Sequence, residues 1–285
     1  MKKPHKYLSL VYPQSGWKLT NVREVGRGKN TDRKARLYLS KIGFFTLVIH
    51  REPPMGLVRQ VCVKLNPSGK IFVVFLVGEP EEGQPEQVMP NEPKKAVAVD
   101  VGVARLATLS DGRFLENPRP LERYLYRIRV LQRSLSRKMK SSKNWFKAKR
   151  RLAKEYEHVK DFRRDLFFKL GALLAQEYDL LVLEELSVVG LIRRGETRRR
   201  LRLHDSSFSE LRRILEWEFK KRGNAVLAVQ AYNTSRECFL CGEINRGLTL
   251  GNRVFRCPHC GFTLDGDLNA CLVLLKCAGW VPPPP

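Results

Sequence analysis

Four of the seven cysteines form two pairs whose spacing is typical of metal ligands. Each pair reads Cys-x-x-Cys, and 15 residues separate the two pairs. Two thiolates on one tight turn can bind one metal ion, and two such turns supply the four ligands of a tetrahedral site. Four sulfurs leave no open coordination position, so we expect one structural zinc ion rather than a catalytic one. The predicted zinc ligands are Cys238, Cys241, Cys257 and Cys260.

The residues next to these cysteines have more ordinary interpretations. A glycine, Gly242 or Gly261, follows each pair and supplies the backbone freedom that such turns use. His259 lies inside the second pair and is interpreted as a bystander. Cys271 and Cys277 fall in the apolar segment that follows, and we assign both to packing.

Carboxylates form the second group of candidate residues. Asp100 ends the apolar run AVAV, Glu184 ends the run LLVL, and Asp267 opens the apolar segment after the second cysteine pair. Taken singly, each acid has an ordinary explanation as a turn former, a strand end or a helix cap. Glu185 and Asp265 stand close beside them, and residue types alone do not decide between the neighbours.

The elements around the acids favour a shared site. A buried strand, a turn and a second strand are expected in 95–114, with Asp111-Gly112 as a tight hairpin. Two helices at 121–178, a strand starting at 179, a helix ending near Gly223 and a further strand follow. This is the element order of RNase H-like folds. In that α/β fold the central strand, a later parallel strand and the C-terminal helix converge, and three acids there hold two Mg²⁺ ions for phosphodiester hydrolysis.

The charge of the chain points to a polyanionic partner. Lys and Arg number 53 against 29 Asp and Glu, which gives a net charge of +24. Residues 121–170 hold 17 basic and 5 acidic side chains, a net of +12. A helix that only faces solvent would normally mix both signs. We therefore expect the basic helical hairpin 121–178 to follow nucleic-acid phosphates. The segment 193–207 is interpreted as a mobile basic loop, in which Arg193, Arg194 and Arg198–Arg200 could steer a strand.

At this level of detail the chain resembles the TnpB (OrfB) family of insertion-sequence proteins, relatives of type V CRISPR effectors with a RuvC-like nuclease core. The resemblance extends over about 35–277. The stretches that carry it are VAVDVGVARLATLSDG, LLVLEELSVVGL, VQAYNTSRECFLCG and FRCPHCGFTLDGDLNA.

The resemblance implies roles for individual residues. Asp100, Glu184 and Asp267 would be the catalytic acids and would bind two magnesium ions, while the four cysteines hold zinc. The family's Glu-Asp-Leu and Asp-x-Asn patterns favour Glu184 over Glu185 and Asp267 over Asp265.

The implied function is an RNA-guided, magnesium-dependent DNA endonuclease associated with an insertion sequence, with DNA and guide RNA as partners. Two alternatives stay open: a guide-independent nuclease for single-stranded or branched DNA, and a truncated nucleic-acid-binding regulator without cleavage. Three converging acids favour a nuclease, because a pure binder gains nothing from negative charge beside phosphate.

Four parts are expected along the chain. A small, wedge-like and barrel-like β domain spans 1–90, and the RuvC-like core spans 91–236. A zinc ribbon that binds target nucleic acid spans 237–262, and the C-terminal helix with its tail spans 263–285. Within these parts, 78–95 is expected to be a linker and the final prolines to be disordered.

The chain also departs from the family's usual form. Family members carry a helical recognition lobe inserted into the β domain, whereas only about 35 residues precede the β segment here, so we expect an N-terminally shortened member. Without an apolar run of roughly 18 residues or a secretory signal, we expect a cytoplasmic, prokaryotic, nucleoid-associated protein that does not engage membranes.

Overall fold

The computed structural model describes most of the chain as two compact units. The described residues are 9–13, 15–25, 32–50, 58–78, 93–185, 197–230, 233–249 and 253–280. The first unit comprises 1–87 with 135–154, and the second comprises 88–134 with 155–285. Most of the predicted linker and the proline tail lie outside the described residues. Within the described part of the chain, no helix is both long and apolar enough to span a membrane.

The first unit contains two antiparallel sheets of three strands, in the orders β1-β5-β6 and β2-β3-β4. Alternating apolar residues form its core, in which Leu37 and Leu39 pack against Val63 and Val73. A turn at 66–69 joins β5 to β6, with Gly69 at a φ of 86°. The strands are β1 (Ser9–Tyr12), β2 (Trp17–Val25), β3 (Asp32–Leu39), β4 (Gly43–Val48), β5 (Val58–Leu65) and β6 (Ile71–Val77).

The second unit is built on a mixed five-stranded sheet in the order β11-β10-β7-β8-β9. The strands β7, β10 and β11 run parallel, while β8 and β9 add an antiparallel meander beside β7. The central strands are therefore apolar on both faces, as expected where helices cover a sheet from both sides. The strands are β7 (Ala96–Asp100), β8 (Arg105–Leu109), β9 (Phe114–Glu116), β10 (Leu180–Glu185) and β11 (Ala225–Gln230).

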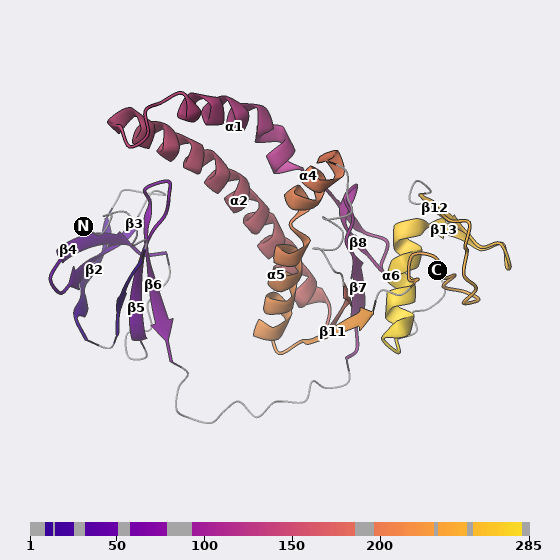
Figure 1. Ribbon diagram of the computed structural model, residues 1–285. Helices are drawn as coiled ribbons and strands as arrows, with labels where there is room; N and C mark the ends of the chain where they lie inside the picture. The colour runs from indigo at the N-terminus through magenta and orange to yellow at the C-terminus, as the bar shows by residue number, and fades with distance from the viewer. Residues whose placement is uncertain are drawn as a thin grey trace. The chain divides into compact units, whose positions relative to one another are not determined.

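Helices cover both faces of this sheet, so the second unit has three layers (Figure 1). On one face, Val99 and Leu183 pack with side chains of α2 and α5. On the other face, Ala98 and Val182 pack against α6. The predicted helices at 121–178 and before Gly223 are confirmed. The helices are α1 (Pro120–Ser136), α2 (Lys143–Glu177), α4 (Thr197–Ser206), α5 (Phe208–Lys221) and α6 (Gly266–Cys277).

The expectation of a mobile loop over 193–207 is wrong for 197–206, which form α4. Arginine and leucine favour helix, and Leu203 becomes buried in the core of the unit. Asp205 and Ser206 are also buried, and partners from other elements satisfy their polar atoms. Arg193 and Arg194 lie outside the described residues.

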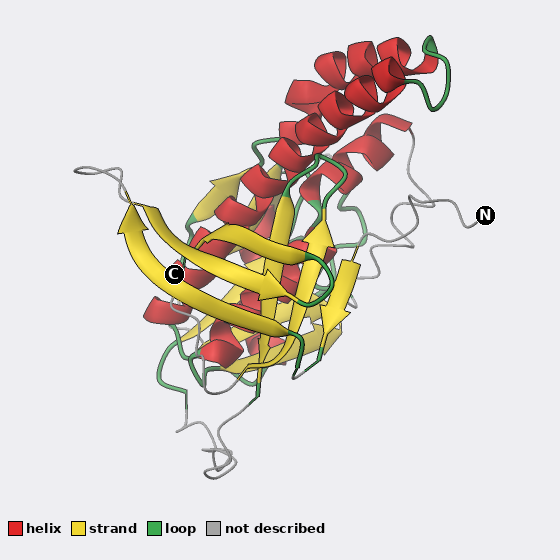
Figure 2. Ribbon diagram, turned by 90° about the vertical axis from the view of Figure 1, so that its left-hand side faces the viewer, coloured by secondary structure: helices red, strands yellow, loops and turns green. Residues whose placement is uncertain are grey.

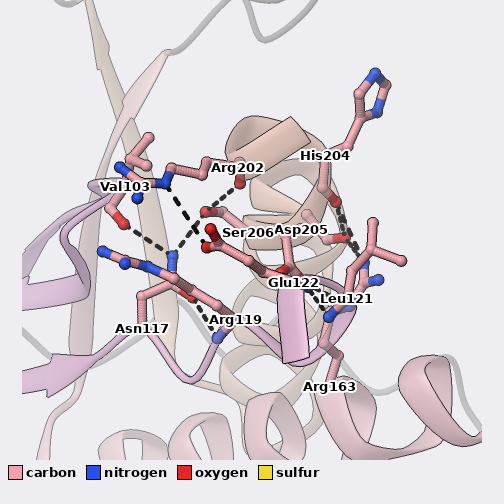
Figure 3. Close-up of polar contacts among 11 residues, drawn as sticks. Val103, Asn117, Arg119, Leu121, Glu122, Arg163, Arg202, His204, Asp205 and Ser206 are labelled. Carbon is pink, nitrogen blue, oxygen red and sulfur yellow. Dashed lines mark hydrogen bonds and ion pairs between the residues drawn. The ribbon is translucent and has the colours of Figure 1, made fainter. Parts of the chain in front are cut away.

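Figure 3 shows the polar cluster that joins α4 to the start of α1. The Asp205 carboxylate accepts the backbone N–H groups of Leu121 and Glu122, each at 2.9 Å. The Asn117 amide donates to the carbonyl of Val103 and to the hydroxyl of Ser206. The first N–H groups of a helix have no partner inside the helix, so Asp205 caps α1 from a distant part of the sequence.

Side-chain contacts hold α1 against α2, and Figure 2 shows the two helices side by side. Arg127 forms an ion pair with Glu155 at 2.8 Å, and the Gln132 amide donates to the hydroxyl of Tyr156 at 2.9 Å. Most of the basic side chains on this helical pair are exposed. The hairpin therefore presents its excess positive charge to solvent.

Candidate metal-binding sites

Asp100 and Glu184 lie level with each other on neighbouring parallel strands. Val99 is paired with Leu183, and each acid is the next residue along its strand. Parallel strands lie about 4.8 Å apart, and alternate residues point to the same face. Ala98 and Val182 face α6, so Asp100 and Glu184, two residues further on, project toward that same face.

Asp267 reaches this position from α6. It lies in the first turn of the helix, and its charge acts on Asp100 together with that of Glu184. Burial and these two charges raise the pKa of Asp100 to about 7. Burial also raises the pKa of Glu184. The structure therefore places the three predicted acids near one another, and the charges of Glu184 and Asp267 both act on Asp100. A divalent cation beside Asp100 would offset this unfavourable charge.

The neighbouring acids have different surroundings. Glu185 is exposed at the end of β10, whereas Glu184 is half-buried. Asp265 is the N-cap of α6 and accepts the backbone N–H groups of Asp267 and Leu268 at 3.1 and 3.2 Å. Its second oxygen accepts a hydrogen bond from Arg105 at 2.8 Å. Asp265 is thus occupied by contacts within the protein, which supports the choice of Asp267 as a metal ligand.

Two arginines border the carboxylate of Asp267. An Oδ atom of Asp267 lies 3.9 Å from Arg105 Nη1 and 3.7 Å from Arg253 Nη1. These contacts are ion pairs too long to be hydrogen bonds, so the lone pairs of Asp267 stay available. Sequence reasoning missed both arginines, because neither belongs to a recognisable motif.

A cavity of about 260 Å³ lies beside Glu184, on the α5 side of the sheet. Arg212 lines it and donates from Nη1 to the Glu184 carbonyl at 3.4 Å. Its Nε donates to Glu216 at 2.7 Å. The Arg212 guanidinium thus contacts the backbone of Glu184 on this side of the sheet.

The four predicted zinc ligands form one cluster. All four sulfur atoms lie within 4.8 Å of one another, with 3.8 Å between Cys238 and Cys260 and 3.5 Å between Cys241 and Cys257. Sulfurs about 2.3 Å from a tetrahedral zinc ion lie about 3.8 Å apart, so the cluster fits that ion. Backbone N–H groups of Cys260 and His259 act on Cys257 and lower the pKa of its thiol to about 6.

The glycine after each cysteine pair adopts the backbone conformation that its expected role in the turn requires. Gly242 and Gly261 have φ values of 78° and 73°, a region that glycine adopts without strain. The packing role of Cys271 is confirmed, because this residue is buried against β7 and β10. The packing role of Cys277 is wrong, since its thiol is exposed at the last turn of α6.

Asn269 connects the cysteine cluster to the acids, a role that sequence reasoning did not find. Its side chain is fully buried, accepts the Phe239 N–H at 3.1 Å and donates to the Glu237 carbonyl at 2.8 Å. Glu237 and Phe239 flank Cys238. The first cysteine turn is therefore fixed to α6 two residues after Asp267.

Two family models match the chain. The family described as "Probable transposase" (OrfB_IS605) matches 61–195, and "Cas12f1-like, TNB domain" matches 208–274. The protein named "Putative RNA-guided DNA endonuclease InsQ", from Escherichia coli K12, is 30% identical over 255 residues. A "Putative RNA-guided DNA endonuclease" from Streptomyces pristinaespiralis is 34% identical over 211 residues. These similarities place the chain among the OrfB proteins of insertion sequences.

The chain belongs to the TnpB (OrfB) family, which confirms the resemblance carried by its motifs. The alignments cover 85% and 74% of this chain, but 61% and 50% of the two relatives. The chain thus spans between half and about three fifths of their length. Two solved structures are also similar. "Cryo-EM structure of the Cas12f1-sgRNA-target DNA complex" has 17% sequence identity and a TM-score of 0.46, and the match covers 93% of this chain and 66% of that chain. "Cryo-EM structure of CRISPR-Cas12f Ternary Complex" has 16% identity and a TM-score of 0.48, and the match covers 96% of this chain and 62% of that chain.

Proposed function

We propose that the chain is an RNA-guided, divalent-metal-dependent DNA endonuclease with an RNase H-like (RuvC) core. The observation that supports this proposal is the placement of Asp100 and Glu184 at the ends of β7 and β10 and of Asp267 in the first turn of α6, where the charges of Glu184 and Asp267 act on Asp100. The strand order and directions of the second unit support the assignment of the core. The printed names of the two bacterial relatives support DNA and guide RNA as partners.

The three acids would hold two magnesium ions. Bound in this way, magnesium supplies an activated water and stabilises the leaving oxygen of a phosphodiester. The protein's contribution is to fix the acids. Two come from rigid neighbouring strands and the third from the first turn of a helix packed on the same sheet face. Backbone elements of this kind hold ligands more exactly in place than loops do.

The basic surface of α1 and α2 would bind the phosphates of the guide or the target strand. This surface carries a net charge of +12 over 121–170, and exposed lysines and arginines release counterions when they meet nucleic acid. The ion held by the four cysteines would be zinc, because thiolates in a closed tetrahedron suit that metal.

We further propose four functional parts: a barrel-like β domain at 1–90, the nuclease core at 91–236, the zinc ribbon at 237–262 and the C-terminal helix at 263–285. In such a chain the zinc ribbon would be an insertion between the last strand and the last helix of the core. The whole protein would act in the cytoplasm of the host, where its nucleic-acid partners lie.

The test is cleavage by the purified protein with its co-purified RNA. Asp100→Ala and Glu184→Ala should each abolish magnesium-dependent cutting while nucleic-acid affinity changes by no more than a few-fold. Glu185→Ala is the matched control, because this exposed neighbour lies outside the acid cluster. Undiminished cutting by Asp100→Ala would disprove the site. Sequencing the bound RNA then decides whether cutting is guided, since a uniform species is expected only in that case.

A further inference from the structure

Arg105 is held in a fixed orientation next to the acid cluster. Its Nη1 donates to Asp265 at 2.8 Å, and its guanidinium lies over the ring of Phe114, 4.4 Å from the centroid. Only 30% of its side chain is exposed. An arginine that stacks on a ring and pairs with a carboxylate has few alternative conformations. Arg105 therefore forms a rigid contact between β8 and the start of α6.

The partner of Arg105 is the residue that begins α6. One oxygen of Asp265 caps the backbone N–H groups of Asp267 and Leu268, and the other receives Arg105. The cap cannot move without carrying Asp267 with it, because Asp267 is only two residues away and is itself capped. The position of β8 is thus transmitted to the Asp267 carboxylate through two hydrogen-bonded groups.

We propose that Arg105 is a positioning residue of the metal site: by holding Asp265, it sets the place of Asp267 relative to Asp100 and Glu184. This inference rests on the proposed function, because it concerns the ions that those acids would hold. Groups that orient metal ligands from behind commonly contribute about 10- to 100-fold to metal affinity.

Positioning and simple electrostatics predict opposite results for loss of this arginine. Removal of a positive charge 3.9 Å from Asp267 should by itself strengthen the binding of a cation. Loss of a positioning contact should weaken binding instead. The sign of the change in metal affinity therefore separates the two roles.

The probe is Mn²⁺, titrated into the zinc-loaded full chain and followed by electron paramagnetic resonance. Only binding that Asp100→Ala abolishes is assigned to the acids. Arg105→Gln should weaken this binding about tenfold or more. Asp265→Asn keeps an oxygen that can cap α6 but loses the ion pair, and should weaken binding in the same direction. The double variant Arg105→Gln/Asp265→Asn should lose no more Mn²⁺ affinity than the more affected of the two single variants. Both changes break the same contact, so their effects should not add.

Arg253→Gln is the matched control. Arg253 lies 3.7 Å from the same Asp267 carboxylate, but its side chain is 61% exposed, and its guanidinium shows no contact with Asp265 among the described residues. Its loss should leave Mn²⁺ affinity unchanged or higher. Circular dichroism melting identifies variants that fail to fold. If Arg105→Gln is one of them, Arg105→Lys and Asp265→Asn provide the test.

Failure of the proposed function and failure of the positioning role give different results. If the unmodified chain shows no Mn²⁺ binding that depends on Asp100, the proposed function fails. If it does bind, but folded Arg105→Gln and Asp265→Asn bind Mn²⁺ as tightly or more tightly, the positioning role is disproved and the acid site remains.

Discussion

The carboxylate of Asp205 accepts the backbone N–H of Leu121 at 2.9 Å, although 84 residues separate them in sequence. The same carboxylate caps Glu122, and its side chain is fully buried. Asp205→Asn would turn an amide N–H toward a backbone donor. We expect a loss of about 1–3 kcal/mol in the free energy of unfolding, measured by urea denaturation.

Asp161→Asn is the control for this prediction, because Asp161 is an exposed acid on α2. It removes the same charge and should change stability by less than about 0.5 kcal/mol. Hydrogen exchange should also accelerate at the start of α1 in Asp205→Asn and not in Asp161→Asn. Equal effects of the two variants would contradict the capping role.

The proposed role of the hairpin in nucleic-acid binding predicts a change in the salt dependence of that binding. Arg123, Arg129 and Lys160 are exposed on α1 and α2. Replacing all three by glutamine should reduce the slope of log affinity against log salt concentration by about 2.7 if each contacts a duplex phosphate. Fluorescence anisotropy with labelled DNA at several salt concentrations measures this slope.

A second triple variant separates hairpin contacts from net charge. Lys18 and Lys64 are exposed on strands of the first unit, and Lys41 is exposed in the turn between β3 and β4. Replacing these three lysines by glutamine removes the same three charges. This variant should leave most of the slope intact. The same reduction in both variants would show that binding follows total charge and not the hairpin.

Loss of the zinc ion that we propose at the four cysteines should disturb the proposed acid site as well as the cysteine turns. Asn269 ties the first cysteine turn to α6, so relaxation of that turn releases the helix near Asp267. We expect about one zinc per chain by elemental analysis, and its loss in Cys238→Ser should lower both melting temperature and cleavage rate. Cys277→Ser is the control, since this exposed thiol lies outside the cluster. A folded, zinc-free wild-type chain would refute the assignment.

Asp111 should contribute stability that disappears in acid. Burial raises the pKa of Asp111, but hydrogen bonds from Tyr178 and Arg113 outweigh burial and hold it below its usual value. A carboxyl group with a lowered folded pKa stabilises the protein above its unfolded pKa of about 3.9, and this contribution is lost as pH falls through the folded pKa. The difference in unfolding free energy between wild type and Asp111→Asn should therefore be constant from pH 5 to 8 and shrink below about pH 4. A difference that is unchanged at pH 3 would exclude this linkage.

Much of the site could be predicted from sequence because its residues sit at recognisable ends of regular elements. AVAV and LLVL predict buried strands, so the acids that follow them were expected at one edge of a sheet. The cysteine spacing predicted a cluster that the structure contains. Helical periodicity located α1 and α2 to within a few residues.

The rest could not be predicted because it depends on contacts between distant segments. Segment 197–206 has a polar composition, and the burial of Leu203 and Asp205 against other elements, which its sequence does not reveal, adds to the helix propensity of its arginines and leucines. Asn269 and Arg105 act through partners 30 and 160 residues away, respectively. The sequence around these two residues gives no sign of those partners.

Asp100 and Glu184 each lie one residue beyond the Val99–Leu183 pair, and this equal height also indicates which changes in length the chain can tolerate. Insertions in the segments between the two strands would leave both acids in place, because the ladder between β7 and β10 fixes their relative height. A single residue added inside either strand would turn its acid toward the opposite face of the sheet. The turns between the connecting elements can thus change in length more readily than β7 and β10, because the residue count within each strand decides the face on which its acid lies.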